Sequence, residues 1–256
     1  MSGGQNDYQT MKKIGLNRVL VLSIVGNIVL VMLVAYIGCI KTDFAKRGLQ
    51  KIGIIEKDLK DLPDYTCIQG WTNTLEKLNL DVEVAFFGNS ITRQSDFRKY
   101  FPEKSICNLG YGGDTPERMI LRVDQIKAVH PEKVFVMAGI NGLTRRNSQE
   151  FNETFVTLVD SIKAAVPNAK IYLQSLLPVN PELKNGKQFK NKIERITQYN
   201  AIMNDVAKNK GCTYIDLYSL YAVDDTLPQS LTQDGLHLLP EAYDKWASAI
   251  KKYIEE

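Results

Sequence analysis

Short apolar runs alternate with helical patterns from about residue 71 to the C-terminus. The predicted strands lie at residues 82–87, 105–108, 133–138, 169–174 and 213–216. The predicted helices lie at residues 116–129, 151–165, 190–210 and 240–254. Strands that alternate with helices predict parallel strands joined by right-handed crossovers. We therefore expect an α/β fold, a three-layer α/β/α sandwich around a five-stranded parallel sheet.

A longer apolar run lies at residues 19–40, which carry no charge and are rich in Val, Leu and Ile. About 20 such residues span the hydrocarbon core of a bilayer. We expect an N-terminal tail (1–18), a transmembrane helix (19–40), a stalk (41–70) and one α/β domain (71–256). A cleaved signal peptide is the alternative, although the run exceeds the usual ~7–15 apolar residues and no A-x-A site follows. Lipidation at Cys39 also stays open.

The orientation of this anchor is not fixed by the flanking charges. Lys and Arg precede the apolar run and also follow it, so the positive-inside rule does not decide. A single N-terminal anchor most often leaves the large domain outside the cytoplasm, and we expect that arrangement here. Within the stalk, residues 44–62 have loosely helical spacing of apolar residues, and Pro63 closes that stretch.

Composition narrows the function classes only a little. The chain has 256 residues, 44% of them hydrophobic and 24% charged, which suits one domain with an appendage. A net charge of +3, without a basic run interleaved with aromatics, argues against nucleic-acid binding. No two cysteines form a CxxC pair, so we expect no zinc site. Cys107 and Cys212 are expected to be buried, and a disulfide to Cys67 stays open.

Two small polar segments directly follow the first two predicted strands. Ligands of open α/β sheets bind at the carboxyl ends of the strands, so these segments are candidates for a site. Residues 88–92 place Ser90 on a strand-to-helix turn, with its N–H near a helix N-terminus, although an ordinary helix cap explains it too. Residues 110–115 hold three glycines that allow close backbone approach; a flexible loop or a phosphate cradle is the alternative.

An asparagine and a histidine are the other candidate residues for a site at this edge of the sheet. Asn141 follows the third predicted strand, where its amide can donate to a developing oxyanion, although an Asn-Gly turn explains it equally. His237 lies three residues after Asp234, close enough for the carboxylate to fix the imidazole tautomer; a surface turn is the alternative. The second histidine, His130, precedes the third strand and so lies at the wrong end of the sheet.

Taken in order, the four segments resemble the sequence blocks of the SGNH/GDSL hydrolase superfamily. Residues 88–92 resemble its nucleophile block and 110–115 its glycine block; 139–142 resemble its asparagine block and 234–237 its terminal Asp-x-x-His block. The resemblance extends over nearly all of residues 80–250. There are two departures from the family pattern.

Asn89 replaces the usual Asp beside the nucleophile, which should matter little because an Asn can serve the same turn. Gly142 replaces the Asp that usually follows the block-three Asn, so the aim of Asn141 is less secure.

The resemblance implies a flavodoxin-like sandwich and esterase chemistry without metal or cofactor. It implies a triad of Ser90, His237 and Asp234, with an oxyanion hole formed by the N–H groups of Ser90 and Gly113 and the Asn141 amide. The polar loop at residues 177–192 favours an O-acetylated glycan or a small ester over a long acyl chain, although a solvated loop explains it as well. An acyltransferase with the same triad and a non-catalytic glycan-binding relative are the alternatives, and the oligomeric state stays open.

Overall fold

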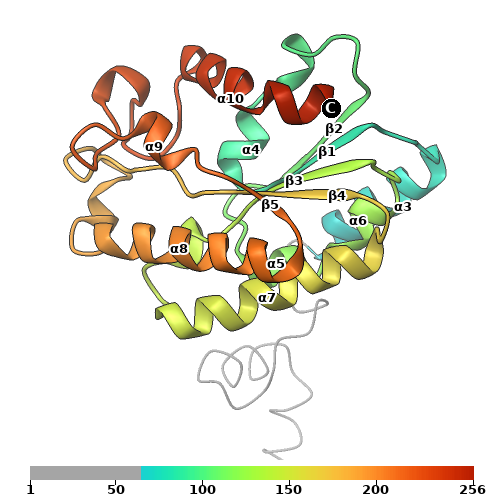
Figure 1. Cartoon of the computed structure of the whole chain (residues 1–256), viewed down its shortest axis with the longest axis horizontal. Coiled ribbons are helices and arrows are strands. Elements are labelled where there is room, and N and C mark those ends of the chain that lie inside the picture. The colour runs from blue at the N-terminus through green and yellow to red at the C-terminus, as the bar shows by residue number, and fades with distance from the viewer. Residues whose placement is uncertain (1–64) are drawn as a thin grey trace, which may run out of the picture. The chain divides into compact units, whose positions relative to one another are not determined.

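One parallel sheet of five strands lies at the centre of the fold, at the positions that the sequence predicts (Figure 1). The strands are β1 (Val84–Gly88), β2 (Ile106–Gly110), β3 (Lys133–Met137), β4 (Lys170–Gln174) and β5 (Thr213–Ile215). They lie in the order β2-β1-β3-β4-β5 and every pairing is parallel, which confirms the predicted α/β fold. The order reverses between β1 and β3, where open α/β sheets form a crevice at their carboxyl edge.

The computed structural model describes residues 65–256. The predicted tail, the membrane segment at 19–40, Cys39 and most of the predicted stalk lie outside these residues. Within 65–256, no helix combines the length and apolarity that a membrane crossing requires.

Helices cover both faces of the sheet, with α4 and α10 on one face and α5 to α8 on the other (Figure 1). The α-helices are α3 (Tyr65–Leu78), α4 (Ser90–Gln94), α5 (Pro116–Ile120), α6 (Asp124–Lys127), α7 (Ser148–Ala165), α8 (Ile193–Lys210), α9 (Tyr218–Tyr221) and α10 (Tyr243–Glu255). Short 3₁₀ turns lie at Phe97–Lys99, Ile140–Gly142, Lys187–Phe189, Gln229–Leu231 and Pro240–Ala242.

The predicted helix at 116–129 is two short helices, α5 and α6, rather than one. Between them the N–H groups of Arg122 and Val123 bond carbonyls three residues back, at 3.1 and 3.4 Å, which tightens the chain into a 3₁₀-like turn. This turn directs the Arg122 side chain inward, where it is 1% exposed.

Helix α3 crosses the boundary that the sequence predicts between residues 70 and 71. The compact unit begins at Thr66, and Ile68 is buried, with 2% exposure. Gln125 Nε2 also donates to the Ile68 carbonyl at 3.4 Å. The first turns of α3 therefore pack with the α/β unit.

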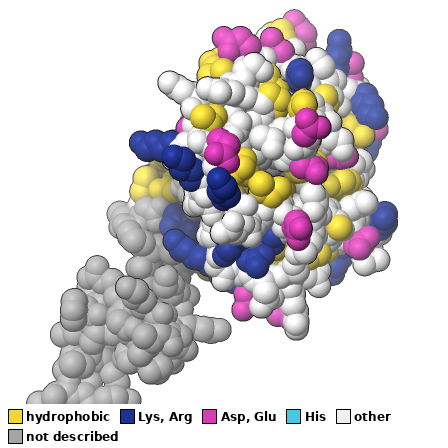
Figure 2. All heavy atoms as spheres, turned by 90° about the vertical axis from the view of Figure 1, so that its left-hand side faces the viewer, with side chains coloured by type: hydrophobic (Ala, Val, Ile, Leu, Met, Phe, Trp, Pro, Cys, Tyr) yellow, Lys and Arg dark blue, Asp and Glu magenta, His cyan; other side chains and the backbone are white. Residues whose placement is uncertain are grey.

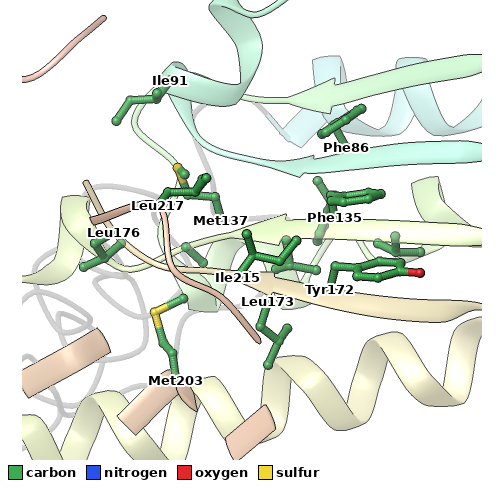
Figure 3. Packing of buried hydrophobic residues seen from close by; sticks show 14 of the residues in the cluster. Phe86, Ile91, Phe135, Met137, Tyr172, Leu173, Leu176, Met203, Ile215 and Leu217 are labelled. Carbon is green, nitrogen blue, oxygen red and sulfur yellow. The ribbon is translucent and has the colours of Figure 1, made fainter. Parts of the chain in front are cut away.

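A row of aromatic side chains supports the sheet on the face covered by α10. Phe86, Phe135 and Tyr172 stand in register on β1, β3 and β4 and stack in sequence, with ring centroids 5.1 and 4.5 Å apart (Figure 3). Phe97 stacks on Phe86 and meets Trp246 of α10 edge-on. Such close aromatic packing holds the strands in fixed register and so fixes where their carboxyl ends lie.

Candidate active site

Ser90 begins helix α4 directly after β1, at the carboxyl edge of the sheet. Asn89 is the N-cap of that helix, with extended backbone, and its Oδ1 accepts from the Ile91 N–H at 2.9 Å. An aspartate would make the same bond, so Asn89 performs the turn's structural task, as the sequence predicts. The cap fixes the turn on which the Ser90 hydroxyl is presented.

Three of the predicted site residues form one hydrogen-bonded chain. Ser90 Oγ lies 2.9 Å from His237 Nε2, although 147 positions separate the two residues. His237 Nδ1 lies 2.7 Å from Asp234 Oδ2. When Nδ1 carries the proton and donates to Asp234, Nε2 is free to accept the proton of the serine hydroxyl.

The Asp234 carboxylate is held in its charged form. Its partial burial alone would raise the pKa, but hydrogen bonds from the His237 side chain, from the N–H groups of His237 and Leu236, and from Asn185 lower it to about 2. Asp234 Oδ1 accepts the two backbone bonds at 2.8 and 2.9 Å. An ionised carboxylate at neutral pH fixes the imidazole tautomer and stabilises an imidazolium.

Asn141 lies beside the glycine-rich loop, in the 3₁₀ turn after β3. Its Nδ2 donates to the Asp114 carbonyl at 2.9 Å, which ties this turn to the residue that follows Gly113. An amide nitrogen has two hydrogens, so the second can serve a ligand. Gly113 has φ of +73°, a conformation that glycine adopts without steric cost. The Asn141 amide is thus fixed in place although Gly142 follows it.

Arg122 is a buried residue of the site region that the sequence analysis missed. Its guanidinium bonds Asp114 Oδ2 at 2.7 Å, the Leu109 carbonyl at 2.9 Å and the Gly88 carbonyl at 3.0 Å. These bonds join the carboxyl ends of β1 and β2 to the glycine-rich loop. The signal was an arginine on the apolar side of the predicted helix at 116–129, eight residues after an aspartate.

Asn185 is the second missed residue, and its Nδ2 donates to Asp234 Oδ2 at 2.7 Å. It belongs to the polar loop at 177–192, which the sequence analysis associated with substrate. No local pattern indicates that this loop contacts residue 234.

An open cleft of about 850 Å³ adjoins the imidazole. Asp234 and His237 form one wall, and the charged side chains of Asp96, Lys99 and Lys184 also line it. Figure 2 views the carboxyl edge of the sheet, where Lys and Arg side chains lie among acidic and apolar ones. The cleft that His237 lines is therefore mixed in polarity and open to water.

The second histidine and the cysteines lie away from the hydrogen-bonded residues Ser90, His237 and Asp234. His130 is at the amino end of β3, with its Nδ1 3.2 Å from Asp81 Oδ1 and its side chain 53% exposed. Cys67 is exposed, and Cys107 and Cys212 are half-buried free thiols rather than fully buried ones. Between residues 65 and 256, no group of three or more His, Cys, Asp or Glu side chains is placed to hold a metal ion.

An α/β sheet with these segments at its carboxyl edge is the architecture of a hydrolase family. Residues 83–245 match the model of the GDSL-like lipase/acylhydrolase family, so the chain belongs to that family.

Comparison with individual proteins agrees with this assignment. The chain is 29% identical over 134 residues to a platelet-activating factor acetylhydrolase IB subunit beta homolog of Drosophila melanogaster, covering 50% of this chain and 56% of that protein. The matched part thus spans about half the length of this curated relative.

Two solved structures share the fold. A GDSL-like lipase from Bacteroides thetaiotaomicron superposes with a TM-score of 0.64 at 24% identity, covering 73% of this chain and 97% of the other. A variant of an acetyl-xylooligosaccharide esterase from Geobacillus Stearmophilus superposes with a TM-score of 0.54 at 20% identity, covering 70% and 97%.

Proposed function

We propose that the chain is a serine esterase that cleaves carboxylic esters through an acyl-enzyme. The chain of hydrogen bonds from Ser90 through His237 to Asp234 carries this proposal. His237 Nε2 takes the hydroxyl proton as Ser90 Oγ attacks the ester carbonyl. The same nitrogen then protonates the leaving alcohol, and water repeats the two steps to release the acid.

The tetrahedral intermediate needs donors for its oxyanion. The backbone N–H groups of Ser90 and Gly113 and the second N–H of Asn141 are assigned this role. Ser90 is the first residue of α4, so its N–H belongs to the unpaired donors of a helix N-terminus. Loss of one such donor typically lowers kcat by ~10²–10³.

The proposed substrate is a small acyl ester, such as an O-acetyl group, on a polar alcohol such as a glycan. His237 protonates the leaving alcohol and also lines the open cleft, so we assign this cleft to the alcohol. The side chains of Lys99, Lys184 and Asp96 in that cleft suit a hydrated, polar alcohol better than a lipid chain. The names of the Drosophila acetylhydrolase relative and the acetyl-xylooligosaccharide esterase neighbour also favour an acetyl group.

We also propose that residues 19–40 anchor the enzyme in a membrane with the hydrolase unit outside the cytoplasm. The uncharged run of Val, Leu and Ile supports this, because such a run is long enough to cross a bilayer. Its test is the loss of membrane sedimentation when residues 1–64 are removed.

Ser90→Ala is expected to abolish hydrolysis of p-nitrophenyl acetate while leaving the protein folded. Removal of a serine nucleophile typically lowers kcat by about 10⁶. The measurement is steady-state hydrolysis by the full-length chain, together with labelling by a fluorophosphonate probe, which requires an activated serine.

The matched control is Ser161→Ala, which removes a serine hydroxyl that only bonds the Thr157 carbonyl on the surface of α7. It should hydrolyse the ester and label like the wild type. Wild-type rates in Ser90→Ala would refute the proposed mechanism.

A further inference from the structure

The loop that connects β4 to α8 is locked onto the Asp-x-x-His segment that precedes α10. The Asn180 N–H donates to the Gly235 carbonyl at 2.8 Å. The N–H groups of Asn185 and Gly186 both donate to the Asp234 carbonyl, at 2.7 and 3.2 Å. The two segments come from opposite sides of β5 in the sequence and meet at the carboxyl edge of the sheet (Figure 1).

The two backbones approach too closely for side chains between them. A Cβ on Gly235 would clash with the Asn180 carbonyl oxygen across this contact, and one on Gly186 would clash with the same atom from within the loop. Asn180 is itself fixed, because its Nδ2 donates to the Leu227 carbonyl at 3.0 Å. Residues 180–186, called the brace below, therefore have a defined position relative to Asp234.

From this position the Asn185 side chain reaches the triad carboxylate. Its Nδ2 donates to Asp234 Oδ2 at 2.7 Å, and the same oxygen faces His237 Nδ1 at 2.7 Å. The other oxygen, Oδ1, accepts the N–H groups of Leu236 and His237. Asn185 thus supplies the one bond to the carboxylate, among those that the structure describes, that comes from a different segment of the chain.

We propose that Asn185 is a positioning residue of the esterase, which orients Asp234 and reduces the negative charge that its Oδ2 presents to His237. An amide N–H donates at every pH, so this bond does not titrate. It withdraws negative charge from the oxygen that the imidazole faces, and the imidazolium is stabilised less than it would be by a free carboxylate. The inference rests on the proposed function.

Other charged groups line the same cleft as His237. Asp96, Lys99 and Lys184 line it together with Tyr243, and Ser90 and Asp234 contact the imidazole directly. Substitution of Asn185 leaves all of these side chains in place. A change in the titration of His237 in such a variant therefore reports the bond from Asn185.

The test is the pH profile of kcat/KM for p-nitrophenyl acetate in the full-length chain. Asn185→Ala is expected to lower kcat/KM about 10–100-fold, the usual effect of losing one hydrogen bond to a charged group. Its acid limb should move to higher pH, since Asp234 now stabilises the imidazolium more strongly. Asn185→Leu, which is similar in size but has no N–H to donate to Asp234, should move the limb in the same direction.

The matched control is Lys187→Ala, which changes an exposed neighbour on the same loop and should leave both the rate and the profile unchanged. An acid limb that stays at the wild-type pH in both Asn185 variants would overturn the inference, whatever happens to the rate. Failure of the proposed function is a separate result, because it appears as activity in Ser90→Ala.

A second readout covers the case in which an Asn185 variant is poorly active. The chain has only two histidines, so proton NMR of the imidazoles resolves His237 beside the distant His130. The pKa of His237 in Asn185→Leu is expected to rise relative to the wild type while that of His130 stays constant. Equal His237 titrations in the two proteins would overturn the inference.

Discussion

Asp234 is a partly buried carboxylate whose pKa lies well below the ordinary value of 3.8, at about 2. Burial acts to raise this pKa, and the four donors that face the carboxylate outweigh it. Because the folded pKa is depressed, the ionised group stabilises the fold fully above the unfolded pKa. That contribution is lost as the pH falls through the folded value.

We therefore expect unfolding free energy to fall by about 1–2 kcal/mol between roughly pH 4 and pH 2 through Asp234 alone, a figure reduced for solvent screening. Asp234→Asn should lack this component and should also lose most activity. Urea unfolding at several pH values measures it. Asp81→Asn, at a carboxylate whose side chain is 86% exposed, is the control and should keep the wild-type pH dependence. Parallel profiles for wild type and Asp234→Asn would contradict the expectation.

For single residues, the sequence predicts some hydrogen-bond partners of the site and not others. Ser90 and His237 could be predicted from the sequence because each lies next to a predicted strand or helix. The carboxyl ends of parallel strands share one edge, so these residues were expected to lie together. The role of Asn185 could not be predicted, since its partner Asp234 lies 49 positions away in a separate loop. Periodicity reports which face of an element is buried, but it does not report which loops meet.

Among the elements, Arg122 joins the ends of two strands to the glycine-rich loop. Arg122→Met is expected to destabilise the fold by about 3–5 kcal/mol, because it leaves the buried Asp114 without its closest cation. The matched control is Arg118→Met, at a second cation on Asp114 whose side chain is 24% exposed, and this should cost less than about 1 kcal/mol. Chemical denaturation at pH 7 measures both, and equal losses would contradict the role assigned to Arg122.

Arg122 also explains why the helix predicted as continuous at 116–129 is interrupted in the structure. Met119, Val123, Ile126 and Val129 have the spacing of one continuous helix. Thr115 does stand at the N-cap position of α5 with Pro116 in the first turn, but its side chain makes no cap hydrogen bond. The interruption follows from a tertiary requirement, since the guanidinium must reach the Gly88 carbonyl 34 positions earlier. Strands were predicted more closely because a buried parallel strand needs only a short apolar run.

For the molecule as a whole, the N-terminal boundary of the hydrolase unit determines which residues can be removed with the proposed anchor without disturbing the site. The sequence places that boundary after residue 70, between the predicted stalk (41–70) and the predicted α/β domain (71–256). Helix α3 runs across it, and Ile68 packs against the unit. Gln125, which donates to the Ile68 carbonyl, also accepts from Arg122, so the start of α3 is connected to the glycine-rich loop.

A chain that begins at residue 65 is accordingly expected to hydrolyse p-nitrophenyl acetate as the full-length chain does, and no longer to sediment with membranes. A chain that begins at residue 71 lacks Ile68, whose burial contributes about 1.5–3 kcal/mol, and should be less stable by that amount in urea. Equal stability of the two truncated chains would place the boundary after residue 70, as the sequence predicts. Loss of activity in the chain from residue 65 would instead show that residues 1–64 contribute to the site, and retained sedimentation would place the membrane contact on the hydrolase unit itself.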